Sequence, residues 1–568
     1  TSHWPPCLNT IDPNDNAASQ EVSLAMTKVT ADMIAAGQAR LNLPETKTAD
    51  SHSAHFIFTD SLTTAAVAKV TGIKDKTVIV DFTTLKTLDT EKVTIDDASG
   101  LEEGTYKKID GKYYLGSAAG VPDEETCKKY GWIYSSKEED NKWMSISKST
   151  VGVFGKAPEE GADLSAGYNG KIDASFNRAR MADWQYQYAA DVSGLGISGA
   201  NNSPVISAGD WVIIGAFCRG TGQMYSGRNG EENKQPTMLN RPYVTNYFDN
   251  IGIDVVVDYW DRYILSDAEL VNMMKVNGAM GASIFEDSIE ATTGTNFWVY
   301  DIVDEIKAHY GPDYEYADEL PIVIAGFVNN AGGPMAAMGF GAEQKDDYLE
   351  FSNVDESVIE RIEQDYFTLM GTLYNEQHCN VSNKWAESIG YSYRAQTYSL
   401  TGMDIAAAAA SVTIPEGESG QNGDGHRQMR SAVNLYDKQC LSMEAITGAK
   451  IYDFNWEDIL FALTSNFSYG INHVIMHGSA YSKSLNGAGA DWPGWDPFRG
   501  SFGEPYTYRQ IYWDKMPLVT DYVARIQAIT QSGTAKVDIA VLVDNKDVFS
   551  SRSGNTFPTL LDNGYSYN

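Results

Sequence analysis

The sequence lacks any apolar stretch long enough to cross a membrane. Its best apolar run, residues 405–412, is mostly alanine and far shorter than the roughly 18 to 20 residues that span a bilayer. It also lacks an initiator methionine, and no charged-then-apolar leader starts at Thr1. We therefore expect no membrane partner, and a chain that begins after processing or within a longer protein.

Cysteine is scarce and scattered. The five cysteines form no CxxC pair, so neither a zinc site nor a dithiol redox motif is indicated. Because five is odd, at least one thiol stays free or pairs outside the chain. N-glycosylation triplets begin at Asn201, Asn380 and Asn466, although such triplets also arise by chance. With the function argued below, they favour a secreted, extracellular protein.

Basic residues are outnumbered by acidic ones. The 43 Lys and Arg against 76 Asp and Glu leave a formal charge of −33. A field of that sign repels nucleic acid and anionic membranes, so we expect neither as a partner. It suits a neutral sugar or a bound divalent cation, and it also keeps a secreted protein soluble. The 43% hydrophobic and 21% charged content is that of a globular protein.

The 568 residues are too many for one compact core, so several domains are expected. Residues 62–237 contain strand-like runs between Gly-rich and charged loops, which predicts a β-rich insertion or subdomain. From residue 238 to 534 strands and helices alternate. We assign residues 1–61 to the N-terminal part of the same barrel, beginning mid-barrel, and residues 535–568 to the start of a C-terminal domain.

The alternating region predicts a parallel sheet covered by helices. The expected strands are residues 253–259, 281–285, 321–325, 391–398, 411–415, 440–443 and 471–476. One helix, residues 456–467, has a capping pair in Asn455 and Asp458, and Gly470 is placed to end it. No nucleotide-binding glycine motif follows any strand, which argues against an open doubly wound sheet. We therefore expect an α/β fold of the (β/α)8 TIM-barrel type.

Acidic residues follow several of these strands directly. In a TIM barrel the ends of all strands share one face, where the chemistry of this fold takes place. The residues that would meet there are Glu286, Asp287, Glu290, Glu416, Glu418, Glu444 and His477. Most glutamates cap helices or face solvent, and a lone histidine is more often structural than catalytic. Position at a strand end makes these residues better candidates than glutamates taken at random.

Such an arrangement fits glycoside hydrolysis. That reaction needs one carboxylic acid to protonate the leaving oxygen and a second carboxylate to activate water or attack directly. Trp492 and Trp495 lie just beyond the last of these strands, where flat rings would hold the apolar face of a sugar. The Trp-Pro-Gly-Trp segment equally fits a rigid packed loop. From the residues alone we expect a barrel hydrolase that acts on sugars.

Several short segments, in order, resemble glycoside hydrolase family 106, the α-L-rhamnosidases. They are WPP from Trp4, GDWVIIGAFCRGTGQ from Gly209, DSIE from Asp287, YRAQTY from Tyr393, residues 406–419, SMEA from Ser442, HGSAYS from His477 and residues 513–517. Each segment is only moderately specific, but their order and spacing together form a strong signal. The resemblance covers most of the chain and is weakest over residues 84–207.

The resemblance implies a (β/α)8 barrel with appended β-domains, and an exo-enzyme that removes terminal α-L-rhamnosyl residues from oligo- or polysaccharides with inversion. By position, Glu290 would be the general acid and Glu444 the general base. Glu418 would hold a calcium ion that contacts sugar hydroxyls, as suits a hard cation. The residues that would contact the sugar are Asp287, Arg394, Gln396, Tyr398 and His477.

Three alternatives stay open. The same fold and mechanism could serve another terminal sugar, or the chain could be a non-catalytic glycan-binding or surface-assembly protein that retains the barrel. A lyase would need a Tyr or Lys base and a basic pocket, which the net charge disfavours. Members of the family carry further sequence before Trp4 and after residue 568. We therefore expect other segments of a longer precursor to complete the barrel.

Overall fold

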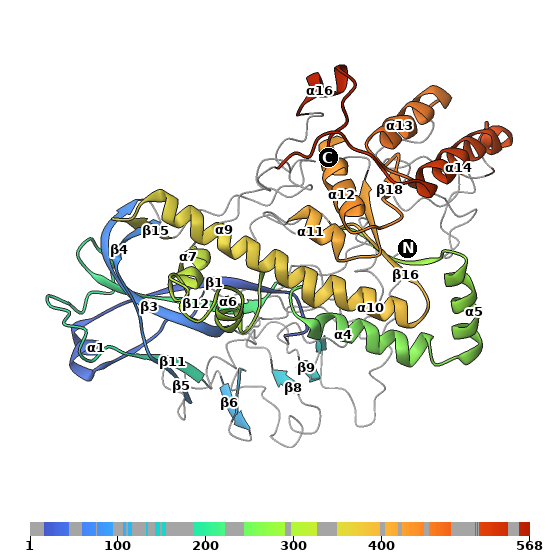
Figure 1. Cartoon of the computed structure of the whole chain (residues 1–568). Helices are drawn as coiled ribbons and strands as arrows, with labels where there is room; N and C mark the ends of the chain where they lie inside the picture. Colours follow the sequence, from blue (N-terminus) through green and yellow to red (C-terminus); the bar gives the residue numbers. More distant parts are fainter. Residues whose placement is uncertain are drawn as a thin grey trace. The chain divides into compact units, whose positions relative to one another are not determined.

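The computed structural model describes part of the chain (Figure 1). The described residues are 16–44, 60–74, 77–94, 106–109, 112–115, 132–134, 143–147, 150–154, 186–221, 244–289, 297–326, 349–397, 404–418, 423–447, 454–478, 506, 508, 510–542 and 556–568. They fall into two compact units: Thr1–Tyr263 with Thr292–Met370, and Ile264–Ala291 with Gly371–Asn568. We call these unit 1 and unit 2. No helix of the described part is long and apolar enough to cross a bilayer.

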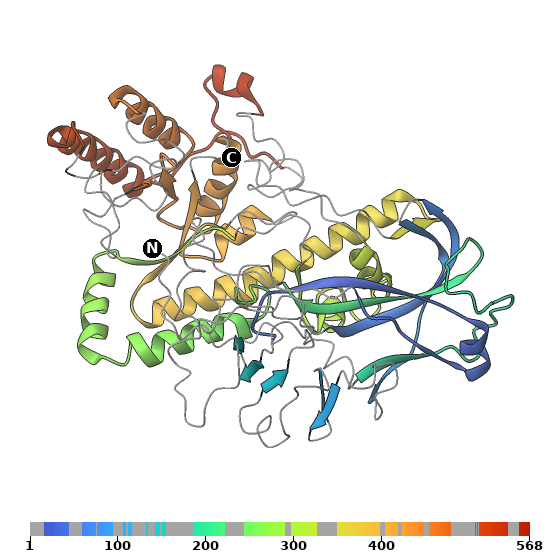
Figure 2. The same ribbon diagram turned by 180° about the vertical axis from the view of Figure 1, so that it is seen from behind.

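Unit 1 is built on a six-stranded sheet in the order β14-β1-β12-β3-β4-β15 (Figure 2, where β1, β3 and β4 are blue and β15 is yellow). The strands are β1 (Gln20–Lys28), β3 (Ser61–Lys74), β4 (Thr77–Thr87), β12 (Trp211–Gly220), β14 (Phe297–Trp298) and β15 (Leu349–Ser352). Neighbours are antiparallel except β4 and β15. On β12, Val212 and Ile214 pack into one apolar cluster and Ile213 into another, since alternate residues face opposite sides.

Smaller elements complete unit 1. Three short sheets contain β2 (Gln38–Arg40), β11 (Tyr186–Asp191) and β5 (Thr90–Thr94); β10 (Thr150–Phe154), β9 (Trp143–Ser147) and β8 (Trp132–Tyr134); and β6 (Tyr106–Ile109) and β7 (Lys112–Leu115). The helices are α1 (Ala31–Ala36), α4 (Asn250–Tyr259), α6 (Ile302–Tyr310), α7 (Glu319–Gly326) and α9 (Glu356–Leu373), whose last residues belong to unit 2. Residues 20–28, assigned above to the barrel, thus lie in an antiparallel sheet. The domain boundaries drawn from the sequence stay predictions.

Two expected barrel strands are helices. Residues 253–259 belong to α4, where the Asp249 side chain accepts a hydrogen bond from the backbone N–H of Ile251 and caps the helix. That cap prevails over the strand preference of the valine run, which is a weak prior. Residues 321–325 belong to α7, where nearly every residue is buried. A short apolar run that is buried all round does not distinguish a helix from a strand.

Unit 2 contains a five-stranded parallel sheet in the order β13-β16-β17-β18-β19. Its strands are β13 (Ser283–Glu286), β16 (Ser392–Ala395), β17 (Ile414–Glu418), β18 (Ser442–Ala445) and β19 (His473–Met476). Each lies within or close to a strand expected from the sequence. The described residues of unit 2 therefore give the strand order of part of a (β/α) barrel, with five parallel strands.

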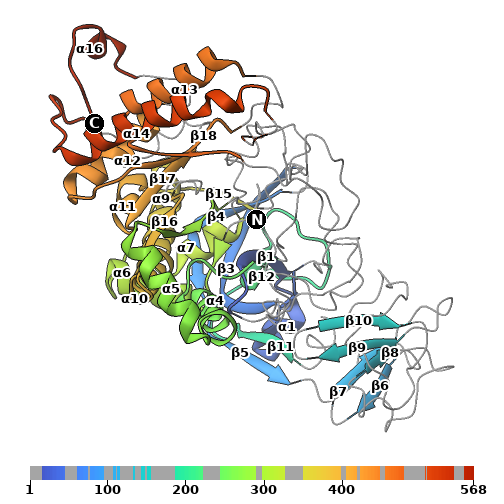
Figure 3. The same ribbon diagram turned by 90° about the vertical axis from the view of Figure 1, so that its right-hand side faces the viewer.

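Helices of unit 2 precede, connect and follow these strands (Figure 3). They are α5 (Ala268–Ala279), the π-helices η3 (Trp260–Ile264), which begins in unit 1, and η4 (Tyr374–Cys379), α10 (Asn380–Ser388), α11 (Ile405–Ala410), α12 (Gly423–Leu435), α13 (Trp456–Ser468), the 3-10 turn η5 (Trp513–Lys515), α14 (Met516–Ser532) and α16 (Pro558–Asp562). The predicted capping box of Asn455 and Asp458 at the start of α13 is confirmed. Gly470, with φ of 98°, follows its end as predicted.

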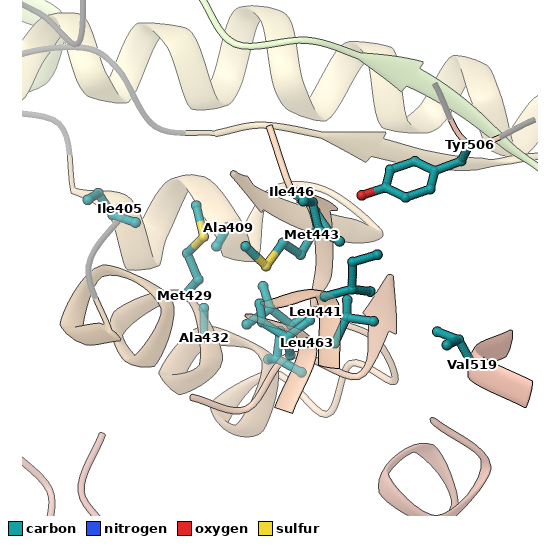
Figure 4. Packing of buried hydrophobic residues seen from close by; sticks show 14 of the residues in the cluster. Ile405, Ala409, Met429, Ala432, Leu441, Met443, Ile446, Leu463, Tyr506 and Val519 are labelled. Carbon is teal, nitrogen blue, oxygen red and sulfur yellow. The ribbon is translucent and has the colours of Figure 1, made fainter. Parts of the chain in front are cut away.

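The core of unit 2 lies between β18 and its covering helices (Figure 4). Met443 and Ala445 of β18 are almost fully buried in this cluster. They pack with Met429 of α12 and Leu463 of α13. Because side chains alternate along a strand, the residues between and before them, Ser442 and Glu444, face away from this apolar layer.

Candidate active site

One face of the parallel sheet carries polar side chains on three adjacent strands. Glu416 of β17 pairs in register with Ser442 of β18, and Glu418 pairs with Glu444. These residues alternate with the apolar ones that contact the helices, so they share the other face. The local sequence, in which polar and apolar residues alternate through Ser442-Met-Glu-Ala445, produces this face directly. We call it the inner face.

Glu416 is the most buried carboxylate on this face, with 0% of the residue exposed. Its Oε2 accepts a hydrogen bond from the guanidinium Nη1 of Arg394, and a second from Ser442 Oγ at 2.5 Å. Arg394 is itself held from the other side, because its guanidinium carbon lies 4.1 Å from the ring centroid of Phe285 and its Nε donates to Ser283 Oγ at 3.4 Å. A charge this deeply buried is tolerated because it is paired and hydrogen-bonded.

Gln396 links Glu416 to Glu444. Its Nε2 donates to Glu444 Oε2 at 2.6 Å and lies 3.4 Å from Glu416 Oε1. Only 1% of Gln396 is exposed. The two hydrogens of one amide nitrogen thus serve two carboxylates on neighbouring strands.

Glu444 has the electrostatics of a proton-transfer residue. Burial, foremost, raises the pKa of its carboxyl from 4.5 to about 7. The negative charges of Asp287, Glu418 and Glu416 contribute to this rise, the hydrogen bond from Gln396 opposes it, and the value of about 7 is the net result. A carboxyl that titrates near neutral pH is suited to take up or release a proton at the pH at which most enzymes work.

His477 directly follows β19, and its Nε2 lies 3.6 Å from Glu444 Oε1. Its backbone N–H donates to the carbonyl of Ala445 at 2.9 Å, which extends the ladder between the two strands. Deeper on the same strand, burial and the charge of Arg394 lower the pKa of His473, which keeps that imidazole neutral. His477 thus lies close to Glu444, and its role in contacting a sugar stays a prediction.

Glu286 lies on the opposite face of the sheet from Glu444. The expectation that it would join the other carboxylates is wrong. Its two carboxylate oxygens lie 2.8 and 3.0 Å from Nε2 of His378, on the π-helix η4. The buried Tyr374 stacks on the imidazole with ring centroids 5.6 Å apart. Strand alternation sends Glu286 to the helices and the next residue, Asp287, to the inner face, where its charge acts on Glu444.

Four predicted residues lie outside the described residues. They are the proposed acid Glu290, the sugar-binding candidate Tyr398, and the aromatic candidates Trp492 and Trp495. Two polar residues of the sheet region had no role from sequence reasoning. Glu416 stood among the strand-end acids without a function, and His378, which contacts Glu286 on the opposite face, was not singled out at all.

Among the described residues, no three His, Cys, Asp or Glu side chains converge as the ligands of a preformed metal site would. Glu418 is half-buried on the inner face, and its negative charge acts on Glu444. Its carboxylate is a hard oxygen donor next to other acidic groups, which is the ligand chemistry that calcium prefers. Glu418 would supply one ligand of such an ion, and other oxygen atoms would have to complete the coordination.

Residues 243–568 match glycoside hydrolase family 106, which is described as alpha-L-rhamnosidase. Because this match covers more than half of the chain, the chain belongs to that family of glycoside hydrolases. No curated protein sequence matches the chain. Among solved structures, a rhamnosidase from Novosphingobium sp. PP1Y is similar over 92% of this chain and 51% of its own, with 13% identity and a TM-score of 0.47. The chain thus spans about half the length of that enzyme.

Proposed function

We propose that this chain carries the active site of a secreted exo-α-L-rhamnosidase that hydrolyses terminal α-L-rhamnosyl residues of oligo- or polysaccharides with inversion. Membership of the family supports the substrate class. The single observation that carries the chemistry is Glu444, a largely buried carboxyl with a pKa of about 7 whose Oε1 lies 3.6 Å from Nε2 of His477. A general base must be ionised near working pH and must release its proton again, which this value allows.

In the proposed reaction, Glu444 takes a proton from a water molecule as the water oxygen attacks the anomeric carbon. The bond from that carbon to the leaving oxygen breaks, and the carboxylic acid of Glu290 gives its proton to that oxygen. Attack from the face opposite the leaving group inverts the anomeric centre. Afterwards Glu444 is protonated and Glu290 is ionised, so one proton must return through solvent before the next turnover.

The remaining candidates would bind the sugar. Asp287 and His477 lie near Glu444 and would hydrogen-bond sugar hydroxyls. Tyr398 follows β16 and would approach from the same side. Trp492 and Trp495 would stack on the apolar face of the sugar, because flat rings match its axial C–H groups. Arg394, which holds Glu416, would contribute its remaining N–H groups, and Gln396, which holds Glu444, would contribute its side-chain carbonyl oxygen.

Calcium would be held by Glu418. When bound, the ion would orient sugar hydroxyls through its oxygen coordination and offset the repulsion among the neighbouring carboxylates. The five parallel strands would form part of a closed (β/α)8 barrel, because a barrel is the arrangement in which no strand edge remains unpaired. In that arrangement Glu444 lies at the C-terminal end of its strand, on the face where this fold carries its chemistry.

The test is a screen of p-nitrophenyl glycosides with the wild-type chain and with E444Q. The proposal expects hydrolysis of the α-L-rhamnoside by the wild type and a loss of several orders of magnitude in E444Q. Preferential hydrolysis of another sugar would keep the mechanism and replace the substrate. Wild-type activity that E444Q fully retains would refute the assignment of the base.

A further inference from the structure

We infer that Glu416 is a positioning residue which, through Gln396, holds the carboxylate of Glu444 in the orientation that water activation requires. This inference rests on the function proposed above and adds a residue to it. Three contacts motivate it: Glu416 with Arg394, Glu416 with Gln396, and Gln396 with Glu444. All of these residues belong to unit 2.

The first step concerns the amide of Gln396, which has a donor end and an acceptor end. Its Nε2 lies 2.6 Å from Glu444 Oε2 and 3.4 Å from Glu416 Oε1. A rotation of the amide by half a turn would place the carbonyl oxygen against two carboxylates instead. Glu416 therefore favours the one amide orientation in which Gln396 donates to Glu444.

The second step concerns why Glu416 is a fixed reference. It is fully buried, and its Oε2 is already occupied by donors from Arg394 and Ser442. Arg394 is in turn held over the ring of Phe285. The carboxylate of Glu416 cannot rotate without breaking these bonds, so its Oε1 remains directed to Gln396.

The third step follows for Glu444. The side chain of Glu444 is 16% exposed, and its carboxylate has Gln396 on Oε2 and His477 on the side of Oε1. Removing the charge of Glu416 while keeping its shape, as in E416Q, lets Gln396 turn its carbonyl inward, because the new amide can donate to it. Glu444 then loses a donor and faces an acceptor. A displacement of about 1 Å at a reacting group lowers a rate by up to about 100-fold.

A double-mutant cycle tests the inference, with kcat on p-nitrophenyl α-L-rhamnoside as the readout. E416Q alone should lower kcat by about 10- to 100-fold with a smaller change in KM. In the background of Q396L, where no amide is present to turn, E416Q should lower kcat by less than about threefold. E416D, which keeps the charge and an acceptor, should recover part of the activity lost in E416Q.

The matched control is H378F, which removes a hydrogen bond to Glu286 on the opposite face of the sheet. Its effect should be independent of Q396L. If E416Q does not fold by circular dichroism, S442A takes its place, because it removes a donor from Glu416 without changing a charge. Equal fold losses from E416Q, or from S442A in its place, with and without Gln396 would overturn the inference. A wild-type chain inactive on every glycoside would instead overturn the proposed function.

Discussion

Gln396 Nε2 lies 2.6 Å from Oε2 of Glu444, and this hydrogen bond opposes the burial that raises the pKa of the glutamate. Burial and like charges favour the protonated carboxyl, whereas the amide donor favours the carboxylate. The balance leaves the pKa at about 7. Removing the hydrogen bond from Gln396 should therefore raise the pKa of Glu444, and removing a neighbouring negative charge should lower it.

The first prediction concerns the pH dependence of kcat/KM. Activity should fall below about pH 7, because protonated Glu444 cannot accept a proton from water. Q396L removes a donor that stabilises the carboxylate, so the acidic limb should move to higher pH. The measurement is the pH profile of kcat/KM for both proteins, with H378F, on the opposite face of the sheet, as the control that leaves the limb in place. An unmoved limb in Q396L would contradict this account of the pKa.

The second prediction concerns stability. A carboxyl whose pKa is raised in the folded state binds more protons folded than unfolded, so stability falls as pH rises from about 4.5 to about 7. E444Q has no such charge and should be more stable than the wild type above pH 7, by up to about 3 kcal/mol for a shift of this size. Urea unfolding at pH 5 and pH 8 measures the difference. If E444Q changes the free energy of unfolding by the same amount at pH 5 and pH 8, ionisation of Glu444 does not destabilise the folded state.

The third prediction concerns Glu290. A general acid matters most when the leaving group is basic, because p-nitrophenolate departs without protonation. E290Q should therefore lose several orders of magnitude in kcat/KM on a rhamnosyl disaccharide and much less on the p-nitrophenyl glycoside. E444Q, which removes the base, should lose comparably on both substrates. The same large loss on both substrates for E290Q would exclude its role as the acid.

The fourth prediction concerns calcium. Removal of the ion with a chelator should reduce activity, because the sugar hydroxyls are no longer held by the cation and the carboxylates around Glu444 repel one another. Calcium added back should restore activity in the wild type. E418Q should start from low activity and respond to neither treatment. Full wild-type activity after exhaustive chelation would refute a calcium role.

The fifth prediction separates the two faces of the sheet. His378 contacts Glu286 on the helix side, away from the inner face, so its loss should affect folding rather than chemistry. H378F keeps a ring against Tyr374 but removes the hydrogen bond, and should destabilise unit 2 by about 1 to 3 kcal/mol. The kcat should change less than about threefold, within the scatter of independent sites. A large fall in kcat at an unchanged unfolding midpoint would place His378 in the catalytic machinery.

Much of the inner face was predictable from the sequence. A strand was expected at residues 440–443, and β18 covers Ser442–Ala445, where polar and apolar residues alternate and Glu444 is directed away from the core. The cap of α13 was also predictable, because Asn455 and Asp458 interact locally, within four residues of chain. Local side-chain to backbone bonds and period-two patterns need no knowledge of distant neighbours.

The errors came from features that depend on tertiary context. The valine run near residue 255 looks like a strand, but the cap at Asp249 and the packing of Ile253 make it a helix. Glu286 and Asp287 are adjacent and equally acidic, yet strand alternation separates them onto opposite faces. The role of Glu416 was not visible from sequence, since its partner Arg394 lies on the neighbouring strand, 22 residues earlier.

The most direct test of the central claim is the stereochemistry of hydrolysis, followed by proton NMR from the first minutes of the reaction. With p-nitrophenyl α-L-rhamnoside as substrate, a base that activates water from the opposite face predicts that β-L-rhamnose appears first, before mutarotation produces the α-anomer. E444Q should release neither anomer at a comparable rate. Initial release of α-L-rhamnose by the wild type would mean that Glu444 does not act as an inverting base.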